Sequence, residues 1–547
     1  MVEKEFNLLH EPWIRAMRPD ATVDELPLPQ VLTRAHEYRS LAGEMPTQDV
    51  AMLRLLLAVL HAVFTRLDEH GEPTPLQNAD DAQDRWQALW AHGSIPAAPV
   101  EEYLRKYEDR FWLFHPERPF WQAHAARIGT EYTAAKLNGE LSESSNKVRL
   151  FPTRTGDAKQ SLTFAEAARW LLYVNGFDDT SAKPKGKNLP SVGAGWLGKL
   201  GLIYAKGHNL FETLLLNLVL VNTHEDTPWS SAVPIWELET AREKEREQIS
   251  LHPDQAALLT LQSRRLLLDH TGNQVTGFRL LGGDFFPKEN AFAEQMTLWR
   301  PVIEKKQVIG YQPARHDPAR KLWREFAAMT ALSGQDGHCP GIITWHRTLV
   351  QANILDKRQF IAYQIASAQY GDSDYFLKDS FSDSITFQAG ILTEMGSAWR
   401  MIVADEVKRC ETAAFHVGLL ALHLRKAAGG SGKAEEANSE RAKAEFFYRV
   451  DEPFRQWLMT LDASQEEAQR VEAQQAWHAT LKGIALQLGS ELADSAGPAA
   501  YRGRTVMENT VKGKDKEAVF YSSPKALGRY QGAISALMER REDDAKA

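Results

Sequence analysis

Four aspartates, Asp372, Asp374, Asp379 and Asp383, lie close together in the sequence and are the residues best spaced to bind metal. Carboxylates that share two metal ions let a nuclease stabilise both the attacking and the leaving oxygen. The alternative is a polar loop followed by a helix N-terminus, where the helix dipole favours aspartate. We favour the loop and expect no catalytic residue, metal or cofactor. A metal-dependent nuclease built on these carboxylates remains the rival hypothesis.

Two Gly-Lys pairs, at 186–187 and 432–433, resemble parts of a phosphate-binding loop. In the first, Ser181 takes the place of the leading glycine and Asn188 that of the magnesium-binding hydroxyl. Neither pair follows a clear apolar strand, which such a loop needs in order to aim its N–H groups at a phosphate. Nucleotide hydrolysis is therefore not expected.

Two basic loops carry the strongest functional signal. The first holds Lys147, Arg149, Arg154 and Lys159. The second, residues 181–207, contains five lysines and five internal glycines but no aspartate or glutamate. Lysines spaced two apart around glycine and proline cannot share a helix face, and glycine lets a backbone approach a groove or phosphate closely. The pattern indicates nucleic-acid binding, and the alternative is an ordinary surface loop.

The overall charge limits how nucleic acid could be bound. With 64 Lys plus Arg against 72 Asp plus Glu, the net charge is −8, which argues against coating nucleic acid over the whole surface. Two cysteines, Cys339 and Cys410, are too few for a disulfide framework or a four-thiolate zinc site. The N-terminus has no apolar signal core, and the apolar runs are short, so we expect a cytoplasmic protein.

The elements that position these loops predict an α+β protein of two domains. Residues 1–378 indicate a large, mixed and mostly helical domain with small β elements that carries the nucleic-acid-binding loops. From about residue 379 strand signals give way to four long amphipathic stretches, at 385–428, 434–461, 465–492 and 524–541. Four such helices with short connections predict a C-terminal four-helix bundle over 379–547.

Three ordered segments resemble a known family. They are residues 6–14 (FNLLHEPWI), residues 111–122 (FWLFHPERPFWQ) and residues 444–449 (AEFFYR), the last followed by Phe454 and Leu458. Each is similar to a segment of the CasA family, the large subunit of the type I-E Cascade, a CRISPR RNA-guided surveillance complex. The resemblance spans nearly the whole chain.

The resemblance implies a non-catalytic subunit of an antiviral complex. In such complexes the guide RNA reads the target by base pairing, while protein reads a short flanking motif, the PAM, in the duplex. Its partners would be guide RNA, the other Cascade subunits, double-stranded target DNA and a helicase-nuclease recruited once the strands separate. Minor-groove readout is degenerate, so several PAMs would be tolerated.

The family's functional loops can be placed on this sequence. The resemblance implies that Phe151, Arg154 and Lys159 contact the guide RNA. A glycine-containing loop against the PAM falls between residues 180 and 201, with Lys183, Lys185, Lys187, Asn188, Gly193, Gly195 and Lys199. A basic finger falls on Arg279, with Lys288 as second choice. The wedge that separates the strands is often a glutamine in the family, and here Asp374 or Tyr375 would occupy that position. Tyr375 could stack on a base.

The sequence leaves a further rival, a helical scaffold that binds only proteins. It differs from the DNA-recognition hypothesis in one testable respect. Under the scaffold hypothesis the lysines of the second basic loop contribute nothing to DNA affinity, whereas phosphate contacts would make that affinity depend on salt.

Overall fold

A computed structural model describes residues 4–144, 147–179, 189–229, 233–239, 246–252, 254–332, 337–430, 433–509 and 516–539. The chain forms two compact units. The first comprises Met1–Arg320, Ala328–Leu355 and Ile361–Ser384. The second comprises Lys321–Ala327, Asp356–Phe360 and Ile385–Ala547.

Helix α2, Pro46–Phe64, is the central helix of the first unit. It starts at Pro46 because the fixed φ of proline suits the first helical turn, where no N–H is required. Although it is long and apolar enough to cross a membrane, nearly all of it is buried within the unit. It packs against α6, Phe164–Phe177, and α8, Gln255–Leu259. This packing fixes α6, whose C-terminal end carries the candidate site.

A five-stranded sheet has the order β14-β13-β8-β15-β16. Its strands are β8 Gly201–Lys206, β13 Thr297–Glu304, β14 Gln307–Pro313, β15 Phe360–Tyr370 and β16 Leu377–Gln388. A second sheet pairs β11, Arg264–Thr271, with β12, Gln274–Gly282, and adds the short strands β6, Thr130–Thr133, and β7, Leu162–Thr163. The loops of interest leave the ends of these strands.

Strand β16 corrects one expectation. The sequence predicts an amphipathic helix from residue 385, but β16 continues to Gln388 and helix α11 begins only at Ser397. Ile385 and Phe387 are buried and alternate with less buried neighbours, a period of two that suits a strand. The apolar residues here therefore belong to a strand and not to the first helix of the bundle.

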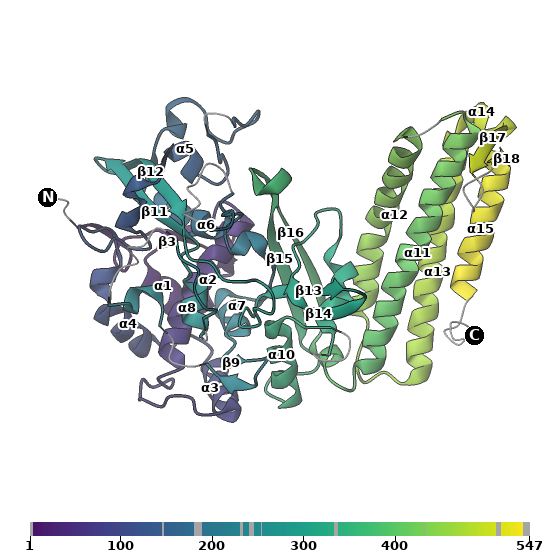
Figure 1. Ribbon diagram of the computed structural model, residues 1–547. Helices are drawn as coiled ribbons and strands as arrows, with labels where there is room; N and C mark the ends of the chain where they lie inside the picture. Colours follow the sequence, from purple (N-terminus) through teal and green to yellow (C-terminus); the bar gives the residue numbers. More distant parts are fainter. Residues whose placement is uncertain are drawn as a thin grey trace. The chain divides into compact units, whose positions relative to one another are not determined.

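The second unit contains four long helices that lie side by side (Figure 1). They are α11 Ser397–Ala427, α12 Lys433–Met459, α13 Glu467–Ser495 and α15 Ser523–Glu539. A short helix, α14 Gly497–Arg502, and a hairpin of β17, Arg504–Asn509, with β18, Lys516–Tyr521, connect α13 to α15. Together with the sheets of the first unit, this bundle confirms the α+β class.

Candidate nucleic-acid interface

Residues 189–199, which belong to the described part of the second basic loop, are here called the glycine loop. The N–H of Gly195 donates to the carbonyl of Asp178 at 2.9 Å, just past the end of α6. A Cβ on Gly195 would lie 2.3 Å from the carbonyl oxygen of Gly176, closer than real atoms approach. Gly193 has φ +63°, a left-handed conformation that glycine adopts without a steric cost. The two glycines therefore shape this loop, and neither position tolerates a bulkier residue without strain.

A buried ion pair holds the glycine loop against helix α2. The indole N–H of Trp196 donates to Oε2 of Glu294 at 2.8 Å. Arg54, on α2, holds the same carboxylate with two hydrogen bonds of 2.8 and 2.9 Å. The side chains of Arg54 and Glu294 are 2% and 0% exposed. Because a desolvated charge is stable only when paired, this contact ties the loop firmly to the core helix.

A second buried pair holds the start of the loop. Arg264, on β11, donates from Nε to Oδ2 of Asp178 at 2.8 Å and from Nη2 to the carbonyl of Gly193 at 2.6 Å. The neighbouring Asp179 accepts from Nζ of Lys136 at 2.8 Å. The charges at the C-terminal end of α6 are thus balanced internally by Arg264 and Lys136.

The loop between β15 and β16, residues 371–376, is here called the wedge loop. Its aromatic residues Tyr375 and Phe376 are 58% and 39% exposed. Lys147, from the first basic loop, donates to the carbonyl of Tyr375, and its ammonium lies 5.6 Å from the ring centre of Phe376. Arg149 donates to the carbonyl of Lys378 at 2.8 Å. The start of the first basic loop therefore lies against the wedge loop and the beginning of β16, although the contacting residues are 228 and 229 positions apart.

Tyr370, at the end of β15, joins the wedge loop to the glycine loop. Its hydroxyl donates to the carbonyl of Phe177, the last residue of α6, at 2.6 Å. A Cβ on Gly198 would lie 2.1 Å from that hydroxyl oxygen. The structure thus brings together three of the loops singled out in the sequence, namely the start of the first basic loop, the glycine loop and the wedge loop.

Cationic side chains collect where these loops meet. Burial is the main reason that the pKa of Lys199 falls to about 8, and the positive charges of Arg264, Arg246 and Arg315 lower it further. Asp374 acts in the opposite direction and raises the pKa of Lys199. Arg246 and Arg315 are cationic neighbours that the sequence did not single out. Arg315 lies in a basic stretch between Lys305 and Arg324, which is a signal in the sequence, but nothing local connects Arg315 to Asp374.

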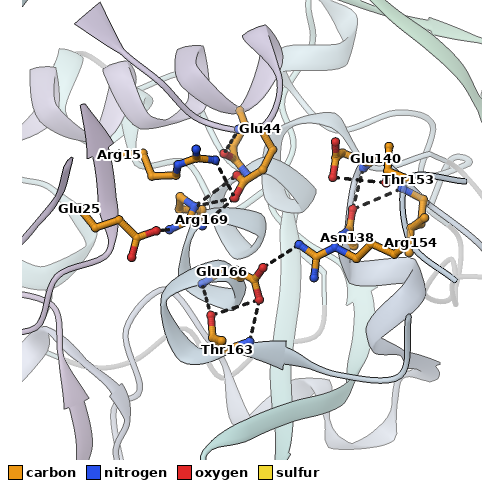
Figure 2. A network of polar contacts seen from close by, with 12 residues as sticks. Arg15, Glu25, Glu44, Asn138, Glu140, Thr153, Arg154, Thr163, Glu166 and Arg169 are labelled. Carbon is orange, nitrogen blue, oxygen red and sulfur yellow. Dashed lines mark hydrogen bonds and ion pairs between the residues drawn. The ribbon is translucent and has the colours of Figure 1, made fainter. Parts of the chain in front are cut away.

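The three residues expected to contact guide RNA have different surroundings. Phe151 is 95% exposed. Arg154 donates to Oε1 of Glu166 at 2.6 Å, and Figure 2 shows it reaching toward that carboxylate, whose other oxygen accepts from the N–H of Thr163. Lys159 pairs with both oxygens of Glu143 at 2.9 Å. Phe151 is thus open to solvent, whereas Arg154 and Lys159 have anionic partners within the chain.

The two residues expected to form the finger lie in different kinds of segment. Arg279 is in the middle of β12, 3.5 Å from Asp269 and 3.9 Å from Glu131, so carboxylates already flank its charge. Lys288 lies half-buried in the connection from β12 to β13. Lys183, Lys185, Lys187 and Asn188 fall outside the described residues.

The four aspartates of the nuclease hypothesis are spread out. Asp372 and Asp374 belong to the wedge loop, while Asp379 and Asp383 lie on strand β16, four residues apart. Asp374 pairs with Arg315 at 2.6 Å. Within the described ranges no group of three or more His, Cys, Asp or Glu side chains is placed to hold a metal ion.

Comparisons with known proteins agree on one family. A model described as CRISPR-associated protein Cse1 matches residues 7–488. CasA/Cse1 of Thermus thermophilus is 31% identical over 342 residues, 60% of this chain and 61% of that relative's length. The crystal structure of Thermobifida fusca Cse1 has a TM-score of 0.81 at 28% identity and covers 98% of each chain. A chain in a structure of a CRISPR RNA-guided surveillance complex has a TM-score of 0.65 at 19% identity, covering 97% of this chain and all of that one.

Fold and site define a mixed α+β protein that presents aromatic and cationic loops from its first unit. Because the family model spans most of its length, the chain belongs to the Cse1 family, also called CasA, the large subunit of the type I-E Cascade. The family that the three sequence segments suggested is therefore confirmed. A Cse1 chain is a non-catalytic subunit, so the family speaks against the nuclease hypothesis.

Proposed function

We propose that this chain is a cytoplasmic subunit of a CRISPR RNA-guided surveillance complex that reads the PAM of a double-stranded target and starts strand separation. The observation that carries the proposal is the meeting of the glycine loop and the wedge loop beside Lys199, Arg246 and Arg315. A tight glycine backbone can enter a minor groove, and cations beside it would hold the phosphates.

The wedge loop supplies the strand-separating residue in this proposal. Tyr375 is exposed at the tip of the loop, and an aromatic ring can stack on a base that has lost its partner. Asp374 is instead paired with Arg315, so we assign the wedge to Tyr375. Once the strands part, the chain would recruit a separate helicase-nuclease, in keeping with the resemblance.

Flank-dependent duplex binding is the experiment that tests the proposal. Guide-RNA complexes assembled with and without the chain would be titrated with two duplexes that differ only beside the protospacer, at fixed salt and with magnesium present. We expect tighter binding to one flank only when the chain is present, without cleavage. Equal affinity for both flanks, with and without the chain, would reject the proposal.

The lysines beyond the described residues separate this proposal from the protein-scaffold hypothesis. Reversing Lys183, Lys185 and Lys187 to glutamate in the same complex should weaken binding to both duplexes. The slope of log affinity against log salt should become shallower by about 0.9 for each phosphate that the chain no longer neutralises. An unchanged affinity and slope would instead favour a chain that binds only proteins.

Phe151 is the described residue that we propose contacts the guide-RNA side of the complex. Its neighbour Leu150 is 90% exposed, so two adjacent apolar side chains lie open to solvent, a feature typical of interaction sites. Phe151→Ala should leave thermal stability unchanged but weaken association of the chain with the remaining guide-RNA complex by about tenfold, as aromatic anchors do in other interfaces. Surface plasmon resonance with the immobilised complex would measure this. Ile128→Ala, which removes a 68% exposed apolar side chain elsewhere, is the matched control.

A further inference from the structure

The carboxylate of Asp374 lies where an external anion would be expected. Arg315 binds it with two parallel hydrogen bonds, from Nη1 to Oδ1 at 2.6 Å and from Nη2 to Oδ2 at 3.0 Å. Burial acts to raise the pKa of Asp374, but the hydrogen bonds and charge of Arg315, with smaller contributions from a backbone hydrogen bond of Ala194 in the glycine loop and the charge of Lys199, lower it below its usual value. The wedge loop thus places its own negative charge against the glycine loop.

The surroundings of this carboxylate are rich in positive charge. Arg264 is offset by its buried partner Asp178, but its field still reaches Lys199. Burial and the charges of Arg264, Arg246 and Arg315 together lower the pKa of Lys199 to about 8, even though Asp374 acts to raise it. Burial is the largest cause, but each of the three arginines lowers the pKa of Lys199 by more than Asp374 raises it, so one carboxylate does not balance the positive charge at this site. An additional or stronger anion would be stabilised there.

The backbone that carries Asp374 is held in an uncommon conformation. Ser373 and Asp374 have φ values of +55° and +58°, in the left-handed region that few residues other than glycine adopt. Such conformations persist when surrounding contacts impose them, and they are frequent in ligand clamps and switches. The ion pair between Arg315 and Asp374 is a contact that holds the loop in this way.

We propose that Arg315, Lys199 and the N–H of Ala194 form a binding site for a nucleic-acid backbone phosphate, which the Asp374 carboxylate occupies in the free protein. A bidentate arginine suits a phosphate as well as a carboxylate, and an adjacent ammonium and backbone N–H complete a common phosphate environment. Phosphate entry would expel Asp374 and release the wedge loop that carries Tyr375. This inference rests on the proposed function and adds to it the way in which DNA contact frees the wedge.

The test uses the free full-length chain and a short fluorescent duplex of unrelated sequence, with binding followed by anisotropy. Asp374→Asn keeps the side-chain shape but removes the competing charge. We expect it to bind about fivefold more tightly than the wild type, as for the loss of a surface ion pair. The salt slope should stay close to that of the wild type, because a phosphate enters the site in both forms and the substitution removes only the competing carboxylate. Asp379→Asn, exposed on β16, makes the same change in net charge and should not reproduce the gain in affinity.

Adding Arg315→Gln to Asp374→Asn should abolish the gain in affinity, because the main ligand of the phosphate is then absent. Hydrogen exchange supplies a second readout, since the amides of residues 371–376 should lose protection when the duplex is added to the wild type. The inference is overturned if Asp374→Asn binds no more tightly than the wild type, or if the gain survives the removal of Arg315. Flank dependence of the assembled complex is measured separately, so failure of the proposed function would not be mistaken for failure of this site.

Discussion

We expect a Gly195→Ala variant to bind the duplex that carries the preferred flank about tenfold or more weakly than the wild type. This corresponds to a loss of roughly 1.4 kcal/mol in binding free energy. Its methyl group would meet the carbonyl carbon and oxygen of Gly176 at 2.6 and 2.3 Å. Both atoms belong to backbone in the last turn of α6, which cannot yield as a flexible side chain would. Overpacking of this kind typically costs about 1–3 kcal/mol. The glycine loop must therefore shift away from α6.

Measurement on the assembled complex, with the two duplexes that differ only in their flank, shows whether this shift matters for recognition. The affinity for the preferred flank should fall toward that for the other flank. Gly483→Ala is the matched control, because a Cβ there, within helix α13, meets no atom within 4 Å. If Gly195→Ala retained full discrimination, the glycine loop would not be the element that reads the flank.

Removal of the Glu294 carboxylate should destabilise the first unit by about 3–5 kcal/mol, the usual cost of leaving a buried charge without its partner. In a Glu294→Ala variant Arg54 remains buried on α2, and the indole N–H of Trp196 loses its acceptor. Both effects weaken the contacts that hold the glycine loop against helix α2. Urea unfolding followed by tryptophan fluorescence would give the change in the free energy of unfolding.

Hydrogen exchange would localise the effect, since amides of the glycine loop should lose protection before those of the helical bundle. The control is Glu37→Ala, which removes an ion pair with Arg34 in which the arginine and glutamate side chains are 37% and 39% exposed. Exposed pairs contribute about 0–1 kcal/mol, so this variant should be nearly as stable as the wild type. Similar losses for both variants would mean that the buried pair does not anchor the loop.

The C-terminal helices could be predicted closely because their information is local. Helix α12 spans Lys433–Met459 against an expected 434–461, and α13 spans Glu467–Ser495 against 465–492. Apolar residues recurring every three or four positions determine such a helix without reference to distant parts of the chain. The strand β16 was missed because its alternation covers few residues and is completed by pairing with other strands.

The sequence by itself determined the helical bundle, the family and the segments in which functional loops occur. Only the tertiary structure decided which side chains of those loops meet. Arg315 and Asp374 are 59 positions apart, and Arg54 and Glu294 are 240 positions apart. Periodicity and composition describe neighbours along the chain, whereas these ion pairs depend on how sheets and helices bring remote strand ends together. For the same reason the sequence could not show that Arg154 and Lys159 find their partners within the chain while Phe151 remains exposed.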